Sequence, residues 1–211
     1  MIFNFMNNLD KLITHFEKFP GIGGRQARRF AFHILTMAPE RVSELTTLMQ
    51  NLQATVTTCS SCQRFYARNG GTSTLCSICS DNNRDHGKLL IVSHDSDIQA
   101  IERGGLYDGL YFVLGGMVPL LGTPDDSRLR GGALKTIVNE RLANLTEIIL
   151  AFAVNPDGEN TARYVESILT PLLSEATTSP TITQLGRGLS TGSELEYADP
   201  ETLKNALKNR G

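Results

Sequence analysis

The sequence predicts an α/β protein with a helical N-terminal region, a small metal-binding ribbon and a domain built on a parallel sheet. Three observations support this class. Residues 8–53 repeat apolar side chains at helical spacing, four cysteines stand in two C-x2-C pairs, and apolar strands alternate with helices from Lys88 onward. The chain has 211 residues, enough for one or two domains with a buried core.

The helical region, residues 1–55, is expected to contain three helices and one sharp turn. Apolar side chains recur on one face from Leu9 to Phe16, again from Arg25 to Met37, and again from Pro39 onward. The segment Phe19-Pro-Gly-Ile-Gly-Gly24 interrupts this pattern and predicts a tight hairpin between the first two helices.

This hairpin fits a helix-hairpin-helix that binds the phosphates of DNA. Gly21 and Gly23 can take positive φ angles and let the main chain approach a phosphate. The amides that open the next helix then point at the anion, and Arg25, Arg28 and Arg29 add positive charge. Phosphate contacts carry no base information, so we expect binding to single- and double-stranded DNA without sequence preference. The alternative is an ordinary turn between helices with solvated arginines.

The four cysteines, in residues 56–81, predict a zinc ribbon. Two residues separate Cys59 from Cys62 and Cys76 from Cys79, so each pair can offer two sulfurs from one turn to a tetrahedral ion. Residues 69–72, Asn-Gly-Gly-Thr, read as the turn of the hairpin between the pairs. We expect one structural Zn²⁺ per chain. Two redox-active pairs or a disulfide staple are the alternatives.

A short polar linker is expected over residues 81–87, followed by the α/β domain over 88–185. Continuous apolar strands alternating with helices imply a parallel sheet covered on both faces, with sites at the carboxyl ends of the strands. The predicted strands are 89–92, 110–114, 147–154 and 181–185, and the predicted helices are 97–103, 134–145, 159–175 and 200–208.

Charge is distributed unevenly along the chain. Residues 1–88 carry 10 Lys and Arg against 6 Asp and Glu, whereas residues 89–211 carry 10 against 16. The N-terminal part is therefore the better place for a polyanionic partner, and the acidic remainder suits proteins. No apolar run is long enough for a membrane span, and no signal peptide is recognisable, so we expect a cytoplasmic, nucleoid-associated protein.

Four stretches in this order resemble the RecR family of bacterial recombination mediators: Phe19–Arg29, the four cysteines, residues 97–116 and residues 188–199. Residues 88–185 resemble a Toprim domain, the fold shared by topoisomerases and primases. Residues 186–211 are similar to the family's Walker B-like C-terminal segment.

The resemblance implies a role without catalysis. Proteins of this family form ring-shaped tetramers that encircle DNA, and they act with RecO and RecF to load RecA onto single-stranded DNA. The family's DNA-contacting basic residues match Arg25 and Arg29, and Arg28 is an additional basic residue here.

One departure from the family pattern identifies the chain as a divergent member. Ser93 stands where relatives carry the glutamate that ends the first Toprim strand, so a Mg²⁺ site lacks one carboxylate. We therefore expect an acidic patch at Glu102, Asp157 and Glu159 to bind a protein, with a RecO-like partner favoured. The alternative is a Toprim-type, Mg²⁺-dependent nuclease. Its candidate ligands are Asp95, Asp97, Glu102, Asp157 and Glu159.

Overall fold

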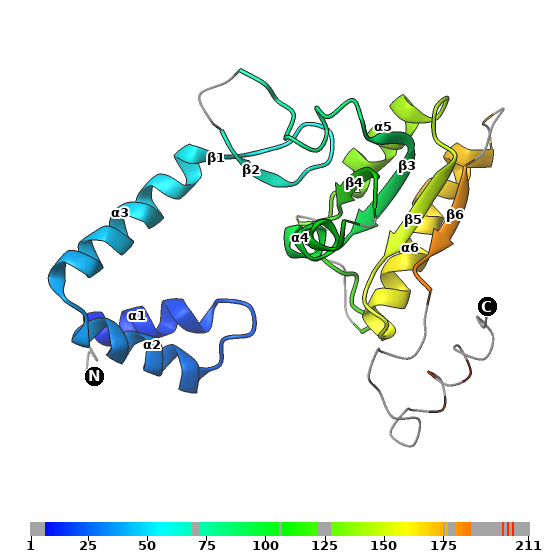
Figure 1. The fold of residues 1–211 in the computed structure, drawn as a ribbon. Helices are drawn as coiled ribbons and strands as arrows, with labels where there is room; N and C mark the ends of the chain where they lie inside the picture. Colours follow the sequence, from blue (N-terminus) through cyan, green and yellow to red (C-terminus); the bar gives the residue numbers. More distant parts are fainter. Residues whose placement is uncertain are drawn as a thin grey trace. The chain divides into compact units, whose positions relative to one another are not determined.

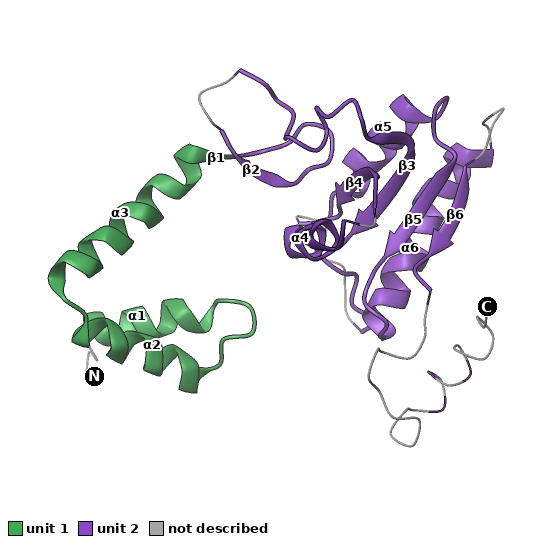
Figure 2. Cartoon of the chain, viewed as in Figure 1, with its two compact units in different colours: residues 1–56 green, residues 57–211 purple. Residues whose placement is uncertain are grey.

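The chain forms two compact units, residues 1–56 and 57–211, which are coloured separately in Figure 2. The computed structural model describes residues 7–68, 72–105, 107–121, 128–174, 176, 180–186, 200, 202 and 204. Among these residues, no helix is both long and apolar enough to cross a membrane.

The first unit contains the three expected helices: α1 (Asn8–Glu17), α2 (Gly24–Thr36) and α3 (Pro39–Thr55). Local chemistry fixes their starts. The side chain of Asn7 accepts a 2.9 Å hydrogen bond from the Asp10 amide and caps α1. Pro39 occupies the first turn of α3, where a missing amide hydrogen costs nothing.

Aromatic packing joins α1 to α2. The Phe16 ring lies edge-on to the rings of Phe19 and Phe30, at centroid distances of 5.9 and 6.0 Å. Ala27 and Ala31, one turn apart on α2, are fully buried. The small alanine side chains let the two helices approach closely.

The second unit starts with a two-stranded sheet, β1 (Val56–Thr58) and β2 (Phe65–Ala67), which belongs to the predicted ribbon. Most of the turn predicted at residues 69–72 lies outside the described residues.

A four-stranded parallel sheet follows, as the sequence predicts. Its strands are β3 (Asp85–Val92), β4 (Gly109–Val113), β5 (Glu147–Ala151) and β6 (Thr181–Gln184), in the order β4-β3-β5-β6. In register, Leu90 of β3 pairs with Tyr111 of β4 and with Ile149 of β5.

Helices cover both faces of this sheet: α4 (Asp95–Gly104), α5 (Gly131–Arg141) and α6 (Pro156–Ser174). Parallel connections are right-handed. The chain moves one way across the sheet from β3 to β4 and the opposite way from β4 to β5 and β6. As a result α5 and α6 share one face and α4 lies on the other (Figure 1).

Most predicted boundaries are shifted by a few residues in the structure, and two of the shifts change the assignment of a segment. Asp85–Gly87, expected in a linker, belong to β3, because the Asp85 amide donates to the Asp108 carbonyl at 2.9 Å and extends the strand. The strand expected to reach residue 154 ends at Ala151. Of the predicted helix 200–208, only residues 200, 202 and 204 are described, each in helical conformation.

Candidate functional site

The four cysteines form one buried cluster. Their side chains are between 0 and 9% exposed, and all four sulfurs lie within 4.8 Å of one another. Cys62 Sγ and Cys76 Sγ are 3.6 Å apart. Sulfurs about 2.3 Å from one tetrahedral ion would stand roughly 3.8 Å apart, so this spacing fits a metal ion.

Main-chain hydrogen bonds shape each C-x2-C turn. The Gln63 amide donates to the Cys59 carbonyl at 3.0 Å, and the Ser80 amide donates to the Cys76 carbonyl at 3.0 Å. The Cys76 amide also donates to Cys59 Sγ at 3.3 Å, a contact that stabilises a thiolate. The two turns therefore hold their sulfurs toward a common centre.

The charge state of the cluster suits a cation. Hydrogen bonds from Cys62, Cys76 and Cys79 hold the pKa of Cys59 well below its ordinary value of 9.0, and hydrogen bonding to Cys59 in turn raises the pKa values of Cys62 and Cys79. A buried group of thiols that already favours a thiolate binds a metal by exchanging its remaining protons for the ion. The donor set of four sulfurs favours zinc or an iron–sulfur centre over Mg²⁺ or Ca²⁺.

The ribbon is docked on the α/β domain. The Val113 amide, at the end of β4, donates to the Cys62 carbonyl at 2.8 Å. Arg130 donates to the Gln63 carbonyl at 2.6 Å and lies 5.5 Å from the centroid of the Phe65 ring. Arg141 donates to the hydroxyl of Ser61, between the first two cysteines. The cysteines and the strands thus share one hydrophobic core.

At the tip of the first unit, Phe19-Pro20-Gly21-Ile22 forms a β-turn closed by a 3.0 Å hydrogen bond from the Ile22 amide to the Phe19 carbonyl. Proline in the second position and glycine with φ +74° in the third are typical of a type II turn. The positive φ angle predicted for Gly21 is confirmed. Gly23 instead has φ −87°, because it is the N-cap of α2 and an N-cap needs an extended backbone.

The start of α2 has amide groups that could bind an anion, but the Glu17 carboxylate lies close to Gly24 and must move aside first. No side chain caps its first turn, so amide groups there lack an intrahelical acceptor. Arg25, Arg28 and Arg29 are exposed. They lie three and four positions apart, on the side of the helix opposite the buried Ala27. The structure therefore brings the three predicted arginines together beside the turn.

At the carboxyl edge of the sheet, Ser93 follows β3 and is 4% exposed. The connections leave β3 and β5 toward opposite faces, so the topological switch point, where parallel sheets commonly bind ligands, lies between these strands. The position at the end of β3 carries a hydroxyl rather than a carboxylate.

Three nearby carboxylates accept hydrogen bonds from backbone amides. Asp95 Oδ1 accepts from Phe65 at 2.6 Å, Asp97 Oδ2 accepts from His94 at 2.8 Å, and Asp157 Oδ1 accepts from Leu120 at 2.8 Å. Each acid anchors a strand, a helix start or a loop. Among the described residues, the four cysteines are the one group of three or more potential ligands close enough for a metal ion.

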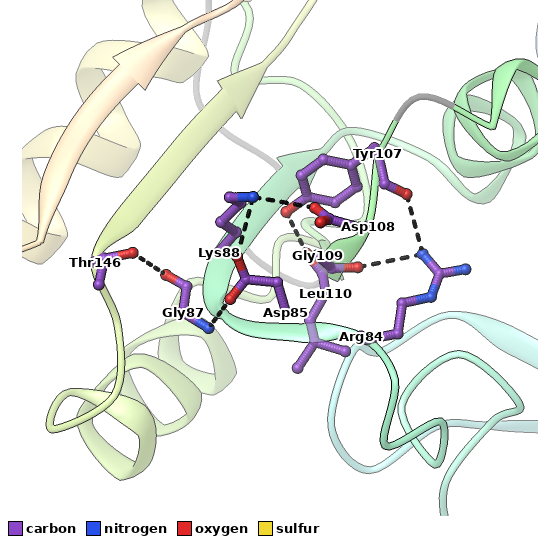
Figure 3. A network of polar contacts seen from close by, with 9 residues as sticks. All are labelled: Arg84, Asp85, Gly87, Lys88, Tyr107, Asp108, Gly109, Leu110 and Thr146. Carbon is purple, nitrogen blue, oxygen red and sulfur yellow. Dashed lines mark hydrogen bonds and ion pairs between the residues drawn. The ribbon is translucent and has the colours of Figure 1, made fainter.

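Glu102 lies at the opposite, amino edge. Its carboxylate accepts hydrogen bonds from Arg84 at 2.5 and 2.9 Å and from the Tyr111 hydroxyl at 2.6 Å. Arg84, and secondarily Tyr111, hold the pKa of Glu102 below its ordinary value of 4.5. Arg84 also donates to the carbonyls of Tyr107 and Gly109, where β4 begins (Figure 3).

The three acidic residues predicted to bind a partner are therefore not one patch. Glu102 is near the start of β4, whereas Asp157 and Glu159 lie in the first turn of α6, at the carboxyl edge. Five residues of strand, roughly 16 Å, separate these edges. Asp157, together with Asn160 and Thr161, binds the main chain of residues 118–120.

Sequence reasoning missed Arg130 and Arg141, which dock the ribbon, and Arg84, which holds the start of β4. Their partners lie between 17 and 80 positions away in the chain. The sequence did contain a signal. An isolated arginine next to an apolar segment can be drawn into the core, and a buried arginine almost always has a polar partner.

Comparison with known proteins covers nearly the whole chain. Three family models match: RecR, helix-hairpin-helix over residues 9–53, the Toprim domain over 88–185, and RecR, C-terminal over 188–210. The recombination protein RecR of Streptococcus thermophilus is 36% identical over 202 residues, which cover 95% of this chain and 94% of the relative.

The chain belongs to the RecR family. Its relatives include the recombination protein RecR of Chlorobium phaeobacteroides, 35% identical over 204 residues, or 96% of this chain and 95% of that protein. The protein of the same name in Staphylococcus saprophyticus is 35% identical over 205 residues, or 96% of each chain. The resemblance inferred from the hairpin, the cysteines and the parallel sheet is confirmed, and the relatives' shared name specifies recombination without naming a reaction.

Proposed function

We propose that this RecR-family protein is a non-enzymatic mediator of recombination and DNA repair that binds DNA through the hairpin of its first unit. The observation that carries the proposal is the group of exposed arginines, Arg25, Arg28 and Arg29, beside an uncapped helix start. Such a site grips phosphates of single- or double-stranded DNA with little regard to base sequence.

Titrating fluorescent oligonucleotides with the protein at several salt concentrations tests this function. We expect similar affinity for unrelated sequences and a steep loss of affinity as salt rises. A salt-independent interaction, or none with either form of DNA, would remove the proposal.

We propose that the cysteine cluster holds one structural Zn²⁺ per chain. Four buried sulfurs leave no open coordination position, which distinguishes a structural from a catalytic site. Metal analysis of protein purified without chelator should find close to one zinc per chain. Iron in place of zinc would point to an iron–sulfur centre.

We further propose, from the family, that the protein assembles into a ring, a tetramer, and loads RecA onto single-stranded DNA with RecO-like and RecF-like proteins. In support of assembly, α3 buries none of its own residues, and Leu48, Met49 and Leu52 are between 59 and 62% exposed. Light scattering during size-exclusion chromatography should give a mass near four chains, and Leu48→Glu with Leu52→Glu should reduce it.

The acidic residues remain the proposed contacts for a basic partner of the RecO kind, now at two separate places. Glu159, in the first turn of α6, tests the contact at the carboxyl edge. Glu159→Lys should weaken binding of the partner and leave DNA binding unchanged. Undiminished partner binding would move the interface elsewhere.

The competing function is a Mg²⁺-dependent nuclease, favoured by the Toprim match alone. Against it stand Ser93 at the end of β3 and the hydrogen bonds that occupy Asp95, Asp97 and Asp157. Incubating labelled DNA or RNA with protein and Mg²⁺ decides between them. Cleavage that disappears in Glu159→Gln would establish the nuclease.

A further inference from the structure

The ribbon presents a basic and aromatic groove outside the hairpin. About 510 Å³ in volume, the groove is lined by Arg64, Phe65, Tyr66 and Arg68 of the β2 strand region, and by Ser73 and Leu75 across from them. Among the described residues that line it none is acidic, although the Asp95 carboxylate accepts a hydrogen bond from the Phe65 amide beside it. Residues 56–80 contain two basic residues, Arg64 and Arg68, and no acidic one.

The two guanidinium groups are available to a ligand. Within the described part of the chain, neither Arg64 nor Arg68 forms a side-chain hydrogen bond or ion pair. Arg64 lies near enough to Glu102 to lower the pKa of that carboxyl slightly, yet Glu102 hydrogen-bonds Arg84 instead. Two unpaired cations on one short strand region form an anion-binding surface.

The aromatic side chains are held in place. Phe65 is 53% exposed, while its amide is fixed by Asp95 at 2.6 Å and Arg130 lies over one face of its ring, which leaves the other face for a base. The Tyr66 hydroxyl donates to the Ser73 carbonyl at 2.8 Å, which pins the tyrosine against the neighbouring strand region. A large apolar ring that is half exposed and already fixed in position can stack on a base. Little side-chain conformational entropy is lost when the base binds.

The negative charge of the metal site does not cancel the positive charge of this groove. A divalent ion with four thiolates carries a net charge of about −2. The sulfurs, however, are buried, and the positive charges of Arg130 and Arg141 bind the adjoining Gln63 carbonyl and Ser61 hydroxyl. The groove therefore faces solvent with its own positive charge.

We propose that this groove is a second nucleic-acid site, which takes single-stranded DNA. Arg64 and Arg68 would contact phosphates while a base stacks on Phe65. Stacking requires an unpaired base, so the site distinguishes single strands from duplexes, which the hairpin does not. The inference rests on the proposed function, in that it adds a strand-selective contact to a protein that binds DNA.

The test compares binding of an oligothymidylate of about 20 nucleotides with binding of a duplex of the same length, using full-length, metal-loaded protein. Phe65→Ala should weaken binding to the single strand about tenfold and change duplex binding less than twofold. Phe65→Trp should restore single-strand affinity because it restores the platform. Arg64→Ala with Arg68→Ala should lower the salt dependence of single-strand binding.

Two controls separate the groove from the hairpin and from net charge. Arg103→Ala with Arg163→Ala removes two exposed charges from the same unit and should leave single-strand affinity within twofold of wild type. Arg25→Ala with Arg29→Ala should weaken both forms of DNA alike. An oligonucleotide with 5-iodouracil, irradiated on the protein, should form adducts on a peptide containing residues 64–68.

Failure of the groove and failure of the proposed function look different. If Phe65→Ala binds the single strand like wild type while the hairpin variant has lost DNA, the groove is not a nucleic-acid site and the proposed function stands. If wild type binds neither form of DNA, both proposals fall. Binding of an acidic peptide, but not of oligothymidylate, to the groove would replace DNA with a protein partner.

Discussion

The first unit holds its helices together with few buried side chains, whereas the second unit is built around a continuous apolar core. Ala27 and Ala31 are the buried residues of α1–α3. In the second unit, β4 is buried along its whole length and the four cysteines share its core. Polar side chains follow the same division, because the arginines of α2 are exposed whereas Arg130 and Arg141 hold the ribbon through hydrogen bonds.

This difference indicates where function and folding can be separated. Residues that we propose to touch DNA in the first unit have no role in its packing. In the second unit, Glu102, Asp95 and Arg130 already hold the fold through hydrogen bonds. Substitutions of these three residues are expected to lower the stability of the fold, so a change in partner binding alone cannot be attributed to a lost contact.

The largest effect is expected from Cys59→Ser with Cys62→Ser. Structural zinc in small domains contributes on the order of 10 kcal/mol, and these cysteines also belong to the core of the sheet. We expect loss of bound metal and a lower unfolding temperature for the whole second unit. Metal analysis and hydrogen exchange along the chain measure both effects. If only residues 57–81 lose protection, the ribbon and the sheet fold independently.

A smaller effect is expected from Glu102→Gln, which leaves Arg84 without a counter-ion. The pair is 17 and 30% exposed, so we expect a loss of about 1–3 kcal/mol in unfolding free energy. Denaturant titration of the variant measures it. Glu140→Gln, which changes an exposed acid on α5, is the matched control and should be neutral.

The same pair predicts a pH dependence. The folded-state pKa of Glu102 lies below its ordinary value of 4.5, so its contribution is present above that value and disappears as the pH falls through the lower, folded-state pKa. Between pH 6 and acid pH, the wild type should therefore lose more stability than Glu102→Gln. Parallel pH profiles of the two proteins would contradict this role for the ion pair.

Gly21→Ala should destabilise the hairpin by about 1–2 kcal/mol, because φ +74° is costly for a residue with a side chain. Hydrogen exchange of α1 and α2 measures the local loss. Gly23→Ser is the control, since φ −87° and an N-cap position suit serine. Equal destabilisation by both would mean that the hairpin resists any side chain, irrespective of φ.

The smallest effect on folding is expected from Arg25→Ala with Arg29→Ala, less than about 0.5 kcal/mol, because both side chains are exposed. The effect on DNA should be large, with the slope of log affinity against log salt falling by about 0.7–0.9 for each lost phosphate contact. A salt titration measures it. If this variant binds DNA as tightly as the wild type does, the hairpin is an ordinary turn between helices and not a DNA-binding site.

Much of the fold could be predicted because its signals are local. The 3.6-residue period marked α1–α3, the apolar runs marked β3, β4 and β5, and Pro20 with Gly21 marked the turn. The cysteine spacing likewise placed four sulfurs in one cluster. In each case a few neighbouring residues determine the outcome.

The tasks of individual polar residues could not be predicted in the same way. Asp95 and Glu102 looked like members of an acidic site, but their partners, Phe65 and Arg84, are 30 and 18 positions away. The chain order gives no sign of which charges meet. Asp85–Gly87 looked like a linker because they are polar, and only the register with β4 reveals them as strand.

The core shared by the cysteines and the sheet limits how this protein can be divided or recombined. A fragment starting at residue 88, where the motifs change, would lack the ribbon that covers the end of β4 and would lose Arg84. Such a fragment would expose apolar surface and aggregate. A division after residue 56 falls between the two compact units. Fragment design, or genetic exchange between homologues, should therefore keep the ribbon and the sheet together as one unit.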